Sequence, residues 1–108
     1  MVMTGTPPSL TGEERKQALD KAMLIRRERA AIKERLNSGE LSVRDILAME
    51  GEAAERMPTR HLIASLPGYG NAKAEKVMRE IGIASNRRLK GLGKRQRAAL
   101  VERLDNKA

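Results

Sequence analysis

The chain contains no cysteine, phenylalanine or tryptophan, and Tyr69 is its single aromatic residue. Without cysteine, disulfides and thiolate metal sites are excluded, and a reducing compartment is the natural setting. Proteins that bind single-stranded nucleic acid stack bases on aromatic side chains, so one tyrosine disfavours that class. We interpret Tyr69 as a packing residue with a solvated hydroxyl, and contact with a ligand is the alternative.

Groups suited to catalysis are also scarce. His61 is the single histidine, and a lone imidazole within an apolar helical pattern is more often packed than catalytic. The acids alternate with bases at helical spacing, which is typical of a solvated surface and not of a metal site. We therefore expect no enzyme activity, no cofactor and no metal. No apolar run approaches membrane-spanning length and no signal-peptide pattern is present, so we expect a cytoplasmic protein without a membrane partner.

The charge that is present is distributed unevenly. Residues 1–57 hold ten basic and ten acidic residues, whereas residues 58–108 hold twelve and four, so the net charge of +8 lies in the second part. Six basic residues occur there within eleven positions that contain no acid: Arg87, Arg88, Lys90, Lys94, Arg95 and Arg97. Such a run is often only a solvated face, but its one-sided charge suits binding to a phosphate backbone.

Two glycine-containing turns accompany this charge. The sequence LPGYG at 66–70 recurs as LKGLG at 89–93, with the shared pattern Leu-x-Gly-apolar-Gly. Pro67 ends the incoming helix, and the glycines permit positive φ and close approach of a ligand. Each turn precedes a helix start, where free N–H groups and the helix dipole favour an anion, and Lys73 adds a cation there. Purely structural turns are the alternative.

The helices that follow the two turns share their spacing as well. Their apolar positions match at the same offsets: Ala74, Val77, Met78 and Ile81 in the first, and Arg97, Leu100, Val101 and Leu104 in the second. Arg97 departs from the pattern because it stands where the first copy has Ala74. We expect its side chain to reach outward.

The remaining sequence predicts an all-α fold. Residues 1–10 are expected to be a flexible tail, residues 11–57 a scaffold of a long helix and a second helix, and residues 58–105 the helical binding region, all in one compact domain. Thr11 and Glu14 form a capping-box pattern for the long helix, which should end near residues 37–39. Its predicted apolar seam comprises Ala18, Ala22, Ile25, Ile32 and Leu36, and Met23 and Met78 lie at core spacing.

Further helix boundaries follow from local signals. Ser42 and Asp45 start a second helix in the capping-box style, which Gly51 is expected to close, and a third helix begins near Pro58. The long helix has mixed charges on its surface, including Arg26, Arg27, Arg29 and Lys33. We interpret it as a scaffold, and a secondary basic contact with the ligand or a partner helix is the alternative.

Three segments together resemble a known family. Residues 65–74 (SLPGYGNAKA), 83–93 (IASNRRLKGLG) and 96–100 (QRAAL) resemble the actinobacterial, mycobacterial-type integration host factor, over roughly residues 11–104. The paired turns with the RRLKGLG run are specific to that family, whereas the first turn alone occurs in many helix-hairpin-helix proteins. The family is unrelated to the strand-armed integration host factor that bends DNA with wedge residues.

The resemblance implies a nucleoid-associated protein that binds double-stranded DNA along the phosphate backbone and minor groove with low sequence specificity. It also implies bending or compaction of DNA, assistance to phage integration beside a recombinase, and a long helix next to a helix-two-turns-helix domain. The DNA-binding positions carried over or inferred are Gly68, Gly70, Lys73, Arg87, Arg88, Lys90, Gly91, Gly93, Lys94 and Arg97. Tyr69 and Asn71 replace a valine and a lysine expected in the first turn, which removes one cation.

The expected mechanism is an electrostatic clamp. Backbone amides of the four turn glycines hold phosphates, and the nearby basic side chains neutralise neighbouring ones. A monomer is expected because no uninterrupted apolar heptad seam remains. Two alternatives stay open: a structured-RNA-binding protein of the ribosomal helix-two-turns-helix type, and a relative of a repair glycosylase, which the missing catalytic proline and zinc cluster disfavour.

Overall fold

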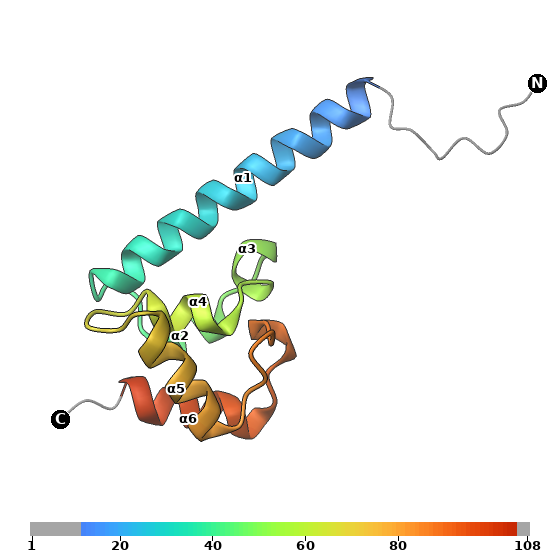
Figure 1. Cartoon of the computed structure of the whole chain (residues 1–108). Coiled ribbons are helices and arrows are strands. Elements are labelled where there is room, and N and C mark those ends of the chain that lie inside the picture. Colours follow the sequence, from blue (N-terminus) through green and yellow to red (C-terminus); the bar gives the residue numbers. More distant parts are fainter. Residues whose placement is uncertain (1–11, 106–108) are drawn as a thin grey trace, which may run out of the picture.

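The computed structural model describes residues 12–105 and is helical in that range (Figure 1). In chain order the elements are α1 (Gly12–Asn37), α2 (Val43–Ala48), α3 (Glu52–Glu55), α4 (Thr59–Ala64), α5 (Asn71–Ile81), a short 3-10 helix η1 (Leu89–Gly91) and α6 (Lys94–Asp105). The all-α prediction is therefore confirmed. The predicted tail at residues 1–10 and the Thr11 part of the capping box lie outside the described residues. None of the helices in the described range is long and apolar enough to cross a membrane.

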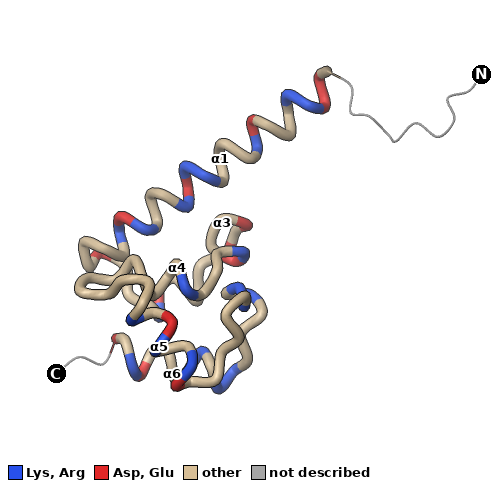
Figure 2. Tube along the Cα trace, viewed as in Figure 1, with Lys and Arg blue, Asp and Glu red and all other residues tan. Residues whose placement is uncertain are grey.

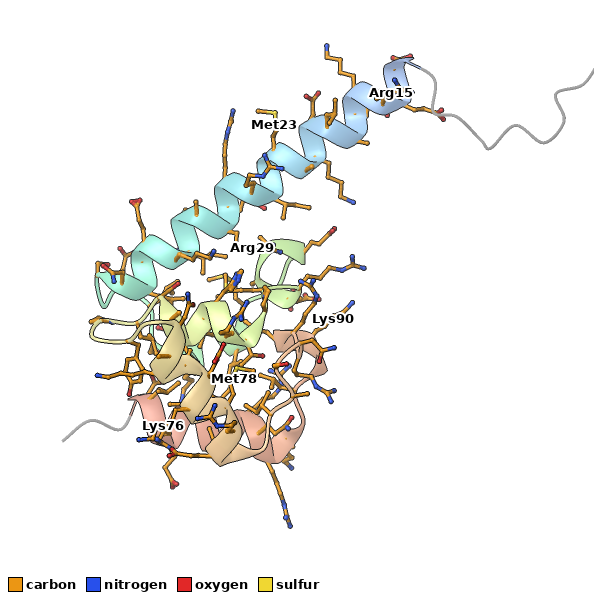
Figure 3. The ribbon with its side chains drawn as sticks, in the orientation of Figure 1. Arg15, Met23, Arg29, Lys76, Met78 and Lys90 are labelled. Carbon is orange, nitrogen blue, oxygen red and sulfur yellow. The ribbon has the colours of Figure 1, made fainter. Side chains whose placement is uncertain are left out.

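Helix α1 extends well past the other helices, and α3 and α4 pack beside its second half (Figure 1). Ile32 and Leu36 are buried there, and Ile25 packs partly buried against the same core. The predicted apolar seam was wrong for the first half, where Ala18 and Ala22 are exposed. Met23 is also 48% exposed and points away from the other helices, contrary to the core position that its spacing predicted (Figure 3). Helical spacing identified a possible face, but no element among residues 12–105 covers it.

Helix α2 begins as the sequence predicts. The Asp45 N–H donates to Ser42 Oγ over 3.1 Å, and the Ser42 N–H donates to Asp45 Oδ2 over 3.0 Å. The backbone and side-chain hydrogen bonds from Ser42 lower the pKa of the Asp45 carboxyl. Gly51 does not close this helix, because Met49 is its C-cap and Gly51, at φ 110°, precedes the unpredicted helix α3.

The core is built from aliphatic side chains, as the lack of aromatics requires. The largest fully buried residues are Leu36, Ile46, Met57, Leu62, Ile63, Leu100, Leu104, Val43 and Thr59. They come from α1, α2, α4 and α6 and, in the case of Met57, from the link between α3 and α4. Helices α3 and α5 contribute the smaller Ala53, Ala54 and Ala74 together with Val77 and Met78. The Asp105 carboxylate joins the end of α6 to the start of α2, since it accepts from the N–H groups of Val43 and Arg44 over 2.8 Å each. The end of α6 thereby caps the start of α2.

Candidate nucleic-acid interface

The first turn joins α4 to α5 and has the compact backbone that its sequence predicts. The Tyr69 N–H donates to the Leu66 carbonyl over 3.0 Å. Gly68 takes φ 81°, in the left-handed region that favours glycine. Gly70 does not use this freedom, because its φ of −141° is extended backbone and it serves as the N-cap of α5. Half-buried Tyr69 packs against the core, as we interpreted from the sequence.

The start of α5 is open to an anion. The Ala74 N–H donates to the Gly70 carbonyl over 2.9 Å, no side chain caps this end, and the first turn holds no acid. A β-carbon built at Gly70 would meet no atom within 4 Å, so a ligand has room to approach the backbone. Lys73 curls back over the turn, with Nζ 3.1 Å from the Gly68 carbonyl oxygen and 5.8 Å from the centre of the Tyr69 ring. The positive end of a helix and one ammonium therefore meet here.

The second turn repeats two backbone hydrogen bonds of the first at an offset of 23 residues. The Leu92 N–H donates to the Leu89 carbonyl over 3.2 Å, and the Arg97 N–H to the Gly93 carbonyl over 2.9 Å. Its glycine amides are nevertheless engaged within the protein. The Gly91 N–H donates to the Arg88 carbonyl and the Gly93 N–H to Gln96 Oε1, each over 2.9 Å. The expectation that these two amides are available for phosphates does not fit this geometry.

Arg87 and Arg88 are fixed along the second turn by their backbones and side chains. The Thr59 N–H donates to the Arg87 carbonyl, and Arg87 Nη1 donates to the Gly91 carbonyl over 3.0 Å. A β-carbon at Gly91 would lie 3.0 Å from Cδ of Arg87, so a larger residue there would require the Arg87 side chain to shift. Arg88 Nη1 donates to the Arg56 carbonyl. Both side chains remain exposed, and each guanidinium keeps further N–H groups for a ligand.

Arg97 does not reach outward, which corrects the sequence-based expectation. Its guanidinium is partly buried and donates to three backbone carbonyls, Leu47 over 3.2 Å, Leu89 over 3.0 Å and Leu92 over 3.4 Å. The remaining predicted cations of this region, Lys90 and Lys94, are exposed. Figure 2 shows basic residues concentrated on the second turn and at the start of α6.

A basic groove of about 970 Å³ lies between α1 and the rest of the fold. We call it the α1 groove, and its charged lining consists of Arg26, Arg29, Lys33, Arg56, Arg88, Lys90 and the single acid Glu52. Figure 3 labels Arg29 on the α1 side and Lys90 on the η1 side. The predicted site residues Arg88 and Lys90 therefore belong to a surface that also includes α1. This arrangement fits the alternative in which the long helix makes a secondary basic contact with the ligand. Arg56 was missed because its flanking residues carry no turn or repeat signal.

His61 lies in the α1 groove with an unusual environment. Its Nδ1 is buried and has no hydrogen-bond partner among the described residues. Burial lowers the pKa of the His61 imidazole, and the nearby cations Lys33, Arg60, Arg29 and Arg88 lower it further. The imidazole is therefore neutral near pH 7, and an anion that entered the groove would favour its protonation.

Comparison with known proteins assigns the fold and the family. Residues 36–104 match the family described as the S13-like H2TH domain, that is, helix-two-turns-helix. The chain is 44% identical to an integration host factor of Mycolicibacterium smegmatis, over 91% of this chain and 95% of the relative. It is 44% identical to that of Mycobacterium tuberculosis, over 89% and 93%, and 40% identical to that of Streptomyces coelicolor, over 86% and 89%. The chain belongs to the integration host factor family.

A solved structure supports the same assignment. It shows sIHF bound to an 8 bp palindromic DNA, and it resembles this chain with a TM-score of 0.77 and 36% identity over 79% of this chain and 98% of that one. The resemblance stated from the sequence and the helix-two-turns-helix fold are confirmed. The individual contact residues stay predictions for this member of the integration host factor family.

Proposed function

We propose that this member of the integration host factor family is an architectural, non-enzymatic protein of the nucleoid that binds double-stranded DNA along its phosphate backbone and minor-groove edges with low sequence specificity. It bends or compacts the duplex as a monomer, and it assists phage integration beside a recombinase. Its family membership and the DNA-bound relative support this proposal. The observation that carries it is the distribution of charge at the helix starts.

Helices of this chain differ in the charge of their first turns. Helices α1, α2 and α3 begin with acids, which stabilise the positive end of the helix dipole. Helices α5 and α6, which follow the two turns, have no acid there and carry Lys73, Lys94 and Arg95 instead. Helix α4 also lacks an acid in its first turn and carries Arg60 there, so the contrast with α1, α2 and α3 covers the whole second part of the described chain. Cations at the positive end of a helix are unfavourable in the free protein, and an anionic ligand removes the penalty. A phosphate backbone supplies such an anion at regular spacing.

The two turns hold phosphates in different ways in this proposal. At the first turn, the open backbone beside Gly70 and the start of α5 receive a phosphate with Lys73. At the second turn the glycine amides are already engaged, so the side chains of Arg87, Arg88, Lys90 and Lys94 neutralise the phosphates. Arginines near a narrow minor groove would favour A·T-rich or easily bent sites, which gives a preference through DNA shape.

The α1 groove extends this surface. Arg88 and Lys90 line both the second turn and the groove, so a backbone held at the turn continues toward Arg26 and Lys33 on α1. Cations of α1 and of the second turn would then face the bound strand from more than one side, which supports the proposed bending of the duplex. The contact with α1 that the sequence left as an alternative thus forms part of the proposed surface.

The test is the affinity for a random-sequence duplex of about 30 base pairs, measured against salt concentration. Engagement of five or six phosphates predicts a slope of log K against log salt of roughly −5. The triple variant Arg87→Ala/Arg88→Ala/Lys90→Ala should flatten the slope by up to about 2.7, at 0.9 for each lost contact. A control variant with Ala at Arg27, Arg44 and Arg79 removes the same charge from outside the turns and the α1 groove and should change the slope little.

A slope near zero for the wild-type protein would contradict the proposal. Equal slopes for the triple variant and its control would remove the second turn from the interface. Competition with a structured RNA of similar length tests the alternative, because a ribosomal type of binding requires that RNA compete better than unrelated duplex DNA.

A further inference from the structure

The second turn forms without a glycine of positive φ, in contrast to the first turn. Gly68 closes the first turn with φ 81°, whereas neither Gly91 nor Gly93 has positive φ. Backbone hydrogen bonds anchor the second turn to the segment before α4, with the Leu89 N–H donating to the Met57 carbonyl and the Thr59 N–H to the Arg87 carbonyl, each over 2.9 Å. Side chains from both ends of the turn add to these bonds. Arg87 donates to the carbonyl of Gly91 inside the turn, and Arg97 donates from α6 to the carbonyls of Leu89 and Leu92.

Arg97 also connects this turn to a distant element. Its Nη1 donates to the carbonyl of Leu47 in the last turn of α2, 50 residues away in the sequence. Carbonyls at the end of a helix lack intrahelical partners and carry the negative end of the dipole, so a guanidinium there is favourable. The planar fork of arginine can serve three acceptors at once, which a lysine ammonium on its flexible stem does less well. The first copy has buried Ala74 at this position and makes no equivalent connection.

We propose that Arg97 is a positioning residue of the DNA-binding surface: it fixes the second turn against α2 so that Lys90 and Arg87 are held in place for phosphates, and it does not itself contact DNA. This inference rests on the proposed function. The sequence places Arg97 among the phosphate contacts because it lies in the basic run, and the structure favours a positioning role instead.

The first experiment uses the wild-type protein, so it does not depend on any variant that fails to fold. NMR of the Arg97 guanidinium should show its Nη1 and Nη2 groups, which donate to the Leu47 and Leu89 carbonyls, protected from hydrogen exchange in the free protein, with a small chemical-shift change when duplex DNA is added. Unprotected Nη groups in the free protein, or a large shift that salt reverses, would overturn the proposal. Exchange in the free protein tests the connection even if DNA binding itself is absent, so the two proposals fail separately.

The second experiment compares substitutions that keep or remove the charge. Arg97→Lys and Arg97→Met should both weaken duplex binding by about tenfold, because both lose the preorganised turn. In a Arg87→Ala/Lys90→Ala background each should have little further effect, since coupled residues are not additive. A direct phosphate contact would instead leave Arg97→Lys near wild type, and the loss in Arg97→Met would add fully to the background.

Discussion

Removing two of the α1 cations that line the α1 groove tests whether bound DNA extends from the turns along this surface. Arg26 and Lys33 are suitable because both line the groove from α1. Arg29 is unsuitable because its Nε donates to the Ala53 carbonyl over 3.1 Å, so its loss would also disturb the packing of α1 on α3. The variant Arg26→Ala/Lys33→Ala therefore changes the charge of the groove with little effect on the fold.

The expected magnitude follows from counterion release. Each lost phosphate contact should flatten the slope of log K against log salt by roughly 0.9, so the double variant should lose up to about 1.8. The same slope gives roughly a fivefold loss of affinity per contact at about 0.15 M salt, and about thirtyfold for two. Alanine favours a helix, so the stability of α1 should be retained.

The assay is titration of a fluorescent 30 bp duplex at several salt concentrations, with Arg27→Ala/Arg44→Ala as the matched control. The control removes two exposed cations, one on α1 and one on α2, that do not line the α1 groove. Long-range charge alone would lower affinity equally in both variants. If the two double variants have the same slope, the groove does not contact the backbone and α1 serves only as a scaffold.

Three further predictions concern the fold and its response to pH. Asp105→Ala removes two charged hydrogen bonds at the start of α2 and should lower the free energy of unfolding in urea by about 2 kcal/mol, with a smaller loss for Asp105→Asn. Gly68→Ala places a side chain at φ 81° and should lower the free energy of unfolding by about 1 kcal/mol. Gly70→Ala should leave stability nearly unchanged and weaken DNA binding. Equal stability losses in the two variants would contradict this account of the turn. The pKa of His61 is lowered from 6.5 in the folded protein, so the unfolded chain takes up the proton first as pH falls. The stability that depends on the neutral imidazole is therefore present above pH 6.5 and lost as pH falls through the folded pKa. His61→Gln should lose less stability over that range, and if both proteins respond alike, His61 is not responsible.

The local parts of this fold were predictable because the interactions that form them span only a few residues. The Ser42 and Asp45 capping box, the end of α1 near Asn37 and the two turns with their 23-residue offset all appear where the sequence places them. Each depends on hydrogen bonds within four or five positions and on the backbone preferences of proline and glycine. Helix α3 was missed because four residues are too few to show a helical period.

The sequence by itself determined that the chain is helical, that its core is aliphatic, and that its net positive charge surrounds two glycine turns. Only the tertiary structure decided what each cation does. Arg97 lies in the same charge run as Lys90, yet packing against α2 turns its guanidinium inward to three carbonyls while Lys90 stays exposed. Arg26 and Arg88 are 62 positions apart, and they line one groove because α1 packs on α3 and α4. The number of charged side chains follows from the sequence, but the direction in which each of them points depends on long-range packing.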